Sequence, residues 1–370
     1  MEGDRAATAV LALTIFAVVC SLAASYATDS AEDAEVRLGD LAVYGSLAAP
    51  GVSIDEYGGV ATLYYEAGGD VEWRLKALDS TYCVSDGGSY RVRGYDDIAV
   101  TGSVLKVDEP GRYAVKLYES GHEVRSGTMV LDGTVERTFE WTQDTPSGRY
   151  TYSVKFEYPF SEYTGYADDR SSPRHQSDAY PEERFIQTRG LEDLEEALGS
   201  EYEKVRGVPA RAGAQDYADY LLSFVQCCIA YPDTIVRTDD GFAYDEGGSG
   251  DLYIYGEREY WAYPLETIHR GYGDCEDTSF LAAALFVGAG YTAAVATLPG
   301  HMIAGVVLDD FAPRGPGMNF RAVKHIPSID ANLFFCETSS EEALPTGYLP
   351  ENVYIEAMGL GSITLVKGAA

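Results

Sequence analysis

The chain has 370 residues, with 27 lysines and arginines against 59 aspartates and glutamates, so its formal net charge is −32. Such an acidic chain is unsuited to nucleic acid as its main partner, because phosphate recognition needs a basic surface. We expect the excess charge to lie on a solvated surface, with recruitment of basic partners or cations as the alternative.

An uncharged apolar segment occupies residues 6–27. It is long enough to cross a bilayer as a helix, and longer than the apolar region of most signal peptides. Arg5 precedes it, whereas Asp29 and Glu32 follow it, which by the positive-inside rule leaves the N-terminus in the cytoplasm. We therefore predict a membrane anchor at residues 1–30, with a cleaved signal segment as the alternative. The protein is then a single-pass protein of the cell membrane, with the bulk of the chain extracellular.

Short runs rich in valine, tyrosine, threonine and isoleucine fill residues 58–157, and turn signals such as "DGGS", "EPGR" and "LDGT" separate them. Strands at this spacing predict an antiparallel sandwich. We place an all-β sandwich-like module at residues 31–157. Nothing in it suggests catalysis, so we expect it to act as a spacer or binding module.

The pattern changes after a polar, proline-broken connection at residues 158–187. "LEDLEEALGSEYEKV" and the apolar stripe within residues 214–231 predict helices, and later segments predict both helix and strand. The third domain, residues 158–370, is therefore expected to be α+β. The six cysteines show no metal-binding spacing and no dense disulfide pattern, so we predict neither a metal nor another cofactor.

One cysteine lies between acidic residues at the start of the apolar run "GYGDCEDTSFLAAALFVGAG". This run predicts a buried helix that ends at Gly288–Gly290. Asp274 is the expected N-cap and Asp277 nearly completes a capping box, so Cys275 becomes the first helical residue. A helix N-terminus stabilises a thiolate, but the carboxylates beside it oppose this effect. Cys275 therefore needs an imidazole partner to act as a nucleophile.

His301 is the predicted partner. After the helix, "YTAAVATL" predicts a buried strand, Pro299 and Gly300 turn the chain, and His301 opens the next strand, "HMIAGVVL". A helix packed on this hairpin would bring the imidazole to the thiol. The other histidines are less suitably placed along the chain; they are His122, His175, His269 and His325.

A third group is needed to orient the imidazole and stabilise its charged form. Glu337 follows the strand-like run "ANLFFC", which we place beside the hairpin. Asp309, Asp310 and Asp330 are its rivals, but they lie in loop-like surroundings.

These residues resemble the core of transglutaminase-like domains, most closely the archaeal and bacterial transglutaminase-like cysteine peptidases. The matching positions are "GDCED", "PGHM" and the later "ET", and the resemblance covers roughly residues 180–360. It differs from the wider superfamily in having a glutamate where aspartate is usual, and in a loop between His301 and Glu337 that has the character of an insertion.

The resemblance implies a papain-like α+β core in which Cys275, His301 and Glu337 form a triad that works through a thioester. Backbone N–H groups at the helix start would bind the oxyanion, and Tyr260 and Trp261 are candidates for a second donor. Asp277 is expected to serve as a cap and a local hydrogen-bond anchor. The predicted activity is that of a cysteine peptidase, amidase or transglutaminase acting on a protein or peptide, including cell-surface proteins.

A non-catalytic reading is also open, in which the same fold serves as a surface binding or scaffold protein. The acidic surroundings of Cys275 favour it, whereas the presence of both Cys275 and His301 favours an enzyme. The sequence does not distinguish water from an amine as the acyl acceptor.

Overall fold

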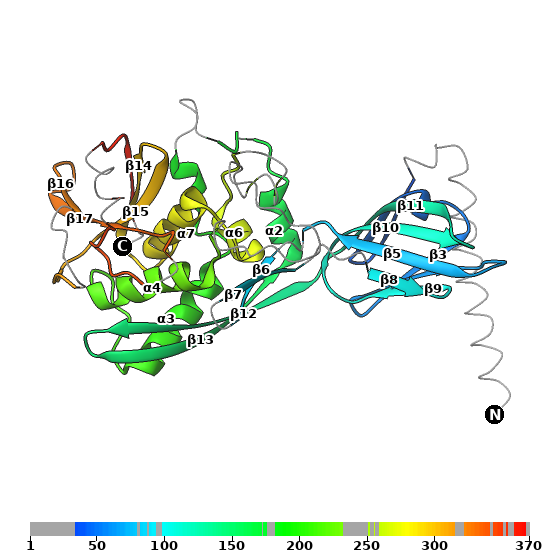
Figure 1. Ribbon diagram of the computed structural model, residues 1–370, viewed down its shortest axis with the longest axis horizontal. Helices are drawn as coiled ribbons and strands as arrows, with labels where there is room; N and C mark the ends of the chain where they lie inside the picture. The colour runs from blue at the N-terminus through cyan, green and yellow to red at the C-terminus, as the bar shows by residue number, and fades with distance from the viewer. Residues whose placement is uncertain are drawn as a thin grey trace. The chain divides into compact units, whose positions relative to one another are not determined.

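The structure is a computed structural model, shown in Figure 1. The part of the chain that it describes comprises residues 34–79, 82–86, 89–93, 98–171, 173–175, 182–231, 251, 255, 259–314, 322–340, 343–350, 353 and 359–367. The chain divides into two compact units, one of residues 1–79 and 94–133 and the other of residues 80–93 and 134–370.

Within its described residues, the first unit is all-β apart from one short 3-10 helix, η1 (Ser46–Ala48). Its larger sheet has the strand order β1-β2-β11-β10-β5-β8, and its smaller sheet has the order β3-β4-β9. The pairs are antiparallel. The strands are β1 (Glu35–Leu38), β2 (Leu41–Gly45), β3 (Val52–Tyr57), β4 (Val60–Tyr65), β5 (Val71–Ala77), β8 (Ile98–Thr101), β9 (Val104–Val107), β10 (Gly111–Glu119) and β11 (His122–Leu131).

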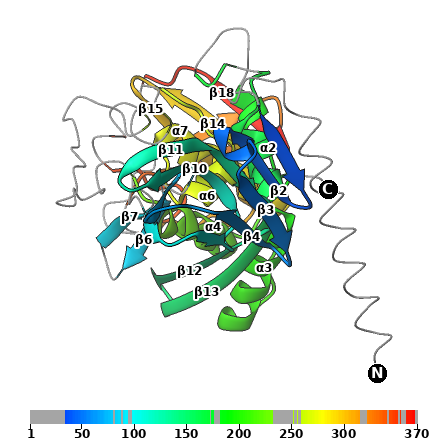
Figure 2. The same ribbon diagram turned by 90° about the vertical axis from the view of Figure 1, so that its right-hand side faces the viewer.

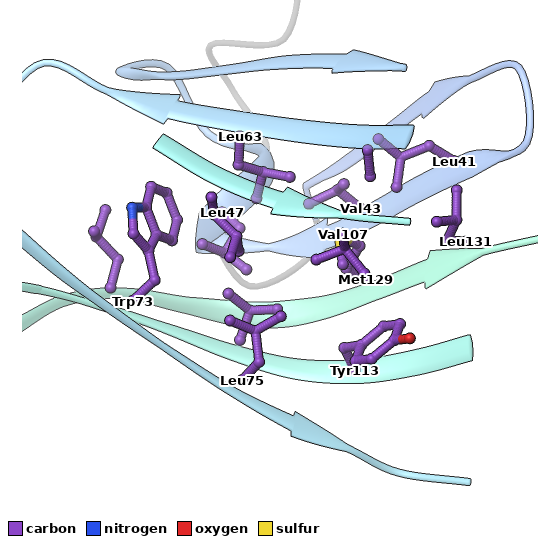
Figure 3. Close-up of a cluster of buried hydrophobic side chains, with 14 of the residues drawn as sticks. Leu41, Val43, Leu47, Leu63, Trp73, Leu75, Val107, Tyr113, Met129 and Leu131 are labelled. Carbon is purple, nitrogen blue, oxygen red and sulfur yellow. The ribbon is translucent and has the colours of Figure 1, made fainter. Parts of the chain in front are cut away.

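Alternating side chains of both sheets form the core of this unit, as a two-layered β structure requires. Tyr113 on β10 and Met129 on β11 are buried together with Leu63 on β4 (Figure 3). Trp73 is fully buried, and its indole N–H donates to the carbonyl of Gly102 at 3.0 Å, so its polar atom is satisfied. The predicted sandwich-like packing is therefore present.

The second unit combines helices with antiparallel sheets, as the α+β prediction requires. Its central sheet has the order β16-β17-β15-β14-β18. The strands are β14 (Thr292–Leu298), β15 (His301–Val307), β16 (Val323–Ile326), β17 (Ala331–Cys336) and β18 (Ile363–Lys367). In the described part of the unit, two hairpins supply the remaining strands; they are β6 (Tyr82–Asp86) with β7 (Ser89–Arg93), and β12 (Thr134–Thr145) with β13 (Gly148–Pro159).

Helix α7 (Cys275–Gly288) packs against β14 and β15. It is buried on all sides from Phe280 to Phe286, because its sequence is apolar without a polar stripe. A separate apolar cluster joins the sheet to the segment after β17 and includes Leu333, Phe335 and Leu349. The other helices are α2 (Phe160–Ala167), η2 (Glu182–Phe185), α3 (Glu192–Arg206), α4 (Gln215–Cys228) and α6 (Pro264–Arg270).

The boundary between the units differs from the predicted one at 157–158. The β12–β13 hairpin belongs to the second unit, where β13 contacts α3 and β12 contacts α4 (Figure 2). The indole N–H of Trp141 donates to Ser223 Oγ at 3.0 Å, and both side chains are buried. Strand propensity identified the hairpin correctly, but it could not show which core the hairpin completes.

The predicted membrane anchor at 6–27 lies outside the described residues. Among the helices that are described, none combines the length and the apolar character needed to cross a bilayer.

Candidate active site

Cys275 is the first residue of α7, as the sequence predicted. The preceding residue, Asp274, has extended backbone angles and occupies the N-cap position. Cys275 is only 6% exposed, so its thiol lies inside the unit rather than on an open surface. The backbone N–H groups of the first helical turn lack partners within the helix, which makes this end suited to a negative charge.

Two groups contact the sulfur of Cys275. Its thiol donates to Glu276 Oε2 at 2.9 Å, and the backbone N–H of Met302 donates to it. Burial raises the thiol pKa well above its usual value, and the carboxylates of Glu276 and Asp274 raise it further. The Met302 N–H acts in the opposite direction. In this arrangement Cys275 is a neutral thiol.

His301 opens β15, one residue before the amide that faces the sulfur. The turn that places it there uses Gly300 at φ 71°, a left-handed conformation that glycine adopts without strain. The imidazole is partly accessible, with 13% of its side chain exposed. Helix α7 and strand β15 therefore bring the backbone of the predicted base to the predicted nucleophile.

Glu337 directly follows β17, the strand that pairs with β15. The pairing of Ala304 with Cys336 sets a register that, continued by one residue, places Glu337 and His301 on the same face of the sheet as diagonal neighbours. Glu337 Oε2 lies 3.0 Å from His301 Nε2. This is the contact that the sequence predicted. It is formed by Nε2, so Nδ1 is the ring nitrogen that does not bond to Glu337.

The carboxylate of Glu337 remains ionised although only 2% of the residue is exposed. Burial alone would raise its pKa, but the hydrogen bonds to His301 and from Ser339 outweigh burial and hold the pKa below the usual value. Oε1 accepts from the backbone N–H of Ser339 at 2.9 Å and also from its hydroxyl. Both carboxylate oxygens are thus satisfied.

Four side chains outside the predicted triad support the turn that carries Glu337; they are Gln226, Thr278, Ser279 and Thr338. Gln226 on α4 donates from Nε2 to the carbonyl of Glu337 at 2.7 Å and accepts from the N–H of Leu344 at 3.0 Å. Thr338 Oγ1 lies 2.9 Å from Thr278 Oγ1 and 3.1 Å from Ser279 Oγ, both on α7. Thr278, Ser279 and Thr338 lie in the segments "CEDTS" and "CETSS". In the sequence, their one sign of importance was a polar side chain within or beside an apolar run.

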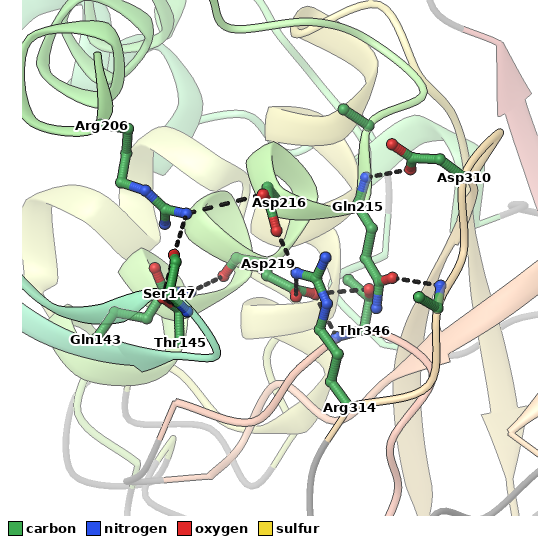
Figure 4. A network of polar contacts seen from close by, with 12 residues as sticks. Gln143, Thr145, Ser147, Arg206, Gln215, Asp216, Asp219, Asp310, Arg314 and Thr346 are labelled. Carbon is green, nitrogen blue, oxygen red and sulfur yellow. Dashed lines mark hydrogen bonds and ion pairs between the residues drawn. The ribbon is translucent and has the colours of Figure 1, made fainter. Parts of the chain in front are cut away.

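A second polar network ties the chain after β17 to the start of α4 (Figure 4). Asp219 accepts from the backbone N–H and the hydroxyl of Thr346, each at 2.7 Å, and from Arg314 at 2.8 Å. Arg314 also pairs with Asp216. Burial raises the pKa of Asp219 to about 6 despite these donors. Asp219 and Gln226 are seven residues apart, so the same face of α4 supports both networks.

Asp274 and Asp277 do not cap α7 as predicted, because no side-chain cap hydrogen bond is present at this helix start. Asp277 instead accepts from the backbone N–H of Ala262 at 2.7 Å, so its expected role as a local anchor is met. Its Oδ2 has no hydrogen-bond partner among the described residues, and burial raises its pKa well above the usual value. The capping box fails because this carboxylate anchors the chain before α6.

Tyr260 and Trp261 were predicted as donors to an oxyanion, but their donors have other acceptors. The hydroxyl of Tyr260 donates to Glu266 Oε1 at 2.8 Å, and both residues are buried. The indole N–H of Trp261 donates to Glu259 Oε1 at 3.1 Å. Each donor is thus already engaged by a carboxylate, so the backbone N–H of Cys275 is the better candidate for oxyanion binding.

Several residues that the sequence offered as alternatives to His301 and Glu337 have other partners. His269 is buried, lies 2.7 Å from the Tyr158 hydroxyl through Nδ1 and stacks on Tyr163. His325 lies 3.8 Å from Asp330 on exposed chain. Asp309 and Asp310 lie beside Arg211. Among the described residues, no group of three or more histidine, cysteine, aspartate or glutamate side chains is placed to hold a metal ion.

The described geometry thus brings His301 and Glu337 into contact, and the residue after His301, Met302, lies beside the sulfur of Cys275. A function for this site has to be inferred from these residues themselves. Comparisons of the chain with models of protein families, with curated proteins and with solved structures give no match.

Proposed function

We propose that the protein is a cysteine acyl-transfer enzyme, a peptidase, amidase or transglutaminase-like enzyme built on a papain-like core. Cys275 is the nucleophile, His301 the general base and Glu337 the residue that orients the imidazole. The observation that carries the proposal is the 3.0 Å contact between His301 and Glu337, formed one residue away from the amide that meets the Cys275 sulfur.

The reaction begins with proton transfer from the thiol to His301. Because the thiol donates to Glu276 in the resting arrangement, the Cys275 side chain has to turn from Glu276 toward the imidazole. The thiolate then attacks a carbonyl carbon, and the carbonyl oxygen becomes the oxyanion of a tetrahedral intermediate. The backbone N–H of Cys275 and the positive end of α7 stabilise that charge.

The intermediate collapses when the carbon–leaving-group bond breaks and His301 gives its proton to the departing amine or alcohol. A thioester on Cys275 remains. Water or an amine next attacks the thioester while His301 accepts its proton, and the returning proton restores the thiol. The ionised Glu337 stabilises the imidazolium that forms in both halves of the reaction.

The substrate in this proposal is a protein or peptide, and the predicted N-terminal anchor would present the site outside the cell. An added amine distinguishes the two acyl acceptors. Faster product release in the presence of an added amine favours a transferase, and an unchanged rate favours a hydrolase.

The experiment that tests the proposal compares the full chain with its Cys275→Ser variant in the hydrolysis of small acyl or peptide esters. Loss of the thiol should reduce turnover by at least ~10³-fold, because serine is far harder to deprotonate. Unfolding free energy should change by less than ~1 kcal/mol, because serine suits a helix start. Equal turnover in both proteins would reject Cys275 as the nucleophile.

A second candidate function is a binding scaffold that has no catalytic activity. It is favoured by the raised thiol pKa and by the hydrogen bond from Cys275 to Glu276 rather than to a base of the triad. The scaffold predicts no turnover in the natural protein and the same ligand affinity after Cys275→Ser. Measurable turnover that depends on Cys275 would exclude it.

A further inference from the structure

Three buried hydroxyl groups connect α7 to the turn that carries Glu337. Thr278, Ser279 and Thr338 are each at most 1% exposed. Thr278 Oγ1 donates to the carbonyl of Asp274 at 2.7 Å, the residue before the nucleophile. Thr338 Oγ1 then lies within hydrogen-bond distance of both Thr278 and Ser279.

The number of protons fixes the direction of this chain of hydrogen bonds. Each hydroxyl carries one proton, and Thr278 uses its proton on the carbonyl of Asp274. Thr338 therefore donates to Thr278, and Ser279 donates to Thr338. The resulting series runs from Ser279 through Thr338 and Thr278 to the carbonyl at the N-cap of α7. Every hydroxyl in it is satisfied, although all are buried.

We infer that Thr338 is a positioning residue that sets the place of Glu337 relative to Cys275. This inference rests on the proposed function. Glu337 touches His301, whereas Thr338 touches neither reacting group and acts through the backbone that it shares with Glu337.

The other supports of the turn act elsewhere. Ser339 holds the carboxylate of Glu337, and Gln226 on α4 holds its carbonyl. The hydroxyl of Thr338 is the contact that extends to the first turns of α7. Removing it frees the turn to shift relative to the thiol while the bonds from Ser339 and Gln226 remain.

Thr338→Val is the appropriate test because valine has nearly the shape of threonine and lacks the hydroxyl. Ser279 is left without its acceptor, but its hydroxyl is free to turn toward the helix backbone one turn earlier. The site should therefore change in position more than in stability.

The measurement is the rate of Cys275 alkylation by iodoacetamide in the folded full chain, followed on the Cys275 peptide by mass spectrometry across pH. Misplacing Glu337 weakens its support of the imidazolium, so the thiolate should form at higher pH in Thr338→Val. We expect the midpoint of the pH profile to rise by about 1 unit and the rate at pH 7 to fall about tenfold. Thr338→Ser keeps the hydroxyl and should restore the original profile.

Thr346→Val is the matched control. Thr346 is also 1% exposed and donates its hydroxyl to a buried carboxylate, but that carboxylate belongs to Asp219. Its loss should lower the unfolding temperature and leave the alkylation midpoint in place. If Thr338→Val is not recovered folded, Thr278→Val removes the same hydrogen bond from the helix side and should give the same shift.

His301→Ala separates failure of this inference from failure of the proposed function. An unchanged Cys275 profile in His301→Ala would reject the thiol–imidazole pair and, with it, both proposals. A profile that shifts in His301→Ala but not in Thr338→Val would overturn the role of Thr338 alone. A shift of equal size in Thr346→Val would also overturn it, because any lost hydroxyl would then have the same effect.

Discussion

Glu337 and Asp277 are both buried carboxyl residues of the second unit, with 2% and 0% of their surfaces exposed, yet their pKa values shift in opposite directions. Glu337 has the imidazole on one oxygen and two Ser339 donors on the other. Asp277 has the N–H of Ala262 on one oxygen and no hydrogen-bond partner, among the described residues, on the other.

The difference shows that burial does not decide whether a carboxyl group carries charge; the number of donors that face it does. A carboxylate with several donors is fit to stabilise an imidazolium. A carboxyl with one donor and acidic neighbours is kept neutral, which suits a structural anchor. Glu337 and Asp277 therefore carry the same functional group but serve different purposes, stabilisation of the imidazolium and anchoring of the chain.

Among substitutions of carboxyl groups, Glu337→Gln should have the largest effect. The amide retains the shape of the side chain but no longer stabilises imidazolium, so the turnover of acyl esters should fall by about 10²-fold or more. In the parent protein the lowered pKa of Glu337 adds stability at neutral pH that is lost as the pH falls below about 4.5. Urea unfolding of Glu337→Gln should show less of this acid-dependent loss. An active variant would show that the charge of Glu337 is not needed.

Asp277→Asn should have the opposite effect on stability. The folded parent keeps this carboxyl protonated at pH values where the unfolded chain, with a pKa near 3.8, has released the proton. The unfolding free energy of the parent therefore falls as the pH rises above about 4.

Asparagine keeps the acceptor for the Ala262 N–H and cannot ionise. Urea unfolding should show that Asp277→Asn is more stable than the parent by about 1–3 kcal/mol at pH 7, the usual scale for a buried group without its partner. The two proteins should be equal near pH 4. A loss of ester turnover as large as that of Glu337→Gln would break the distinction between anchor and catalytic support.

Glu276→Gln tests the acidic end of the site at the thiol itself. Glutamine still accepts a hydrogen bond from the thiol but carries no charge. After burial, the charge of Glu276 is the largest cause of the raised Cys275 pKa. Alkylation of Cys275 should therefore become several-fold faster at pH 7, and its pH midpoint should move downward. Glu136→Gln changes the net charge equally on the surface of β12 and should leave the rate unchanged. A slower reaction in Glu276→Gln would indicate that Glu276 accepts the thiol proton productively.

The smallest effect is expected at Glu195, a carboxyl on α3 whose side chain lies against Gly288 at the end of α7. Burial, followed by the charge of Glu192, raises its pKa to about 8. Parent stability should therefore decline between about pH 4.5 and pH 8. Because the group is partly accessible, Glu195→Gln should add only about 1 kcal/mol at pH 8 and nothing near pH 4. Glu196→Gln, an exposed neighbour, should show no such gain in thermal unfolding.

Local sequence patterns predicted the parts of the site that depend on short-range chemistry. The apolar run after Cys275 specifies a buried helix and its start, and the Pro299–Gly300 turn specifies the hairpin that begins at His301. The apolar run before Glu337 specifies a strand that ends at the carboxylate. Each of these depends on neighbours within a few residues along the chain.

Contacts between segments far apart in the chain could not be predicted from local sequence patterns. The β12–β13 hairpin was assigned to the wrong unit, because its partners on α3 and α4 lie 48 to 82 residues away. Asp277 was expected to cap its own helix but bonds to Ala262, and Tyr260 and Trp261 were expected to be available donors but are bound by carboxylates. Hydrogen-bond partners in a core are chosen by packing, and a residue type does not reveal that choice.

The sequence by itself determined where the thiol, the imidazole and the third carboxylate fall on their elements, because helix starts, turns and strand ends are specified locally. Only the tertiary structure decided the state of each group. It buried Cys275 against Glu276 and the Met302 amide, gave Glu337 enough donors to remain charged, and left Asp277 without them. The physical reason is that a pKa depends on the solvation and the hydrogen bonds supplied by segments far away in the chain.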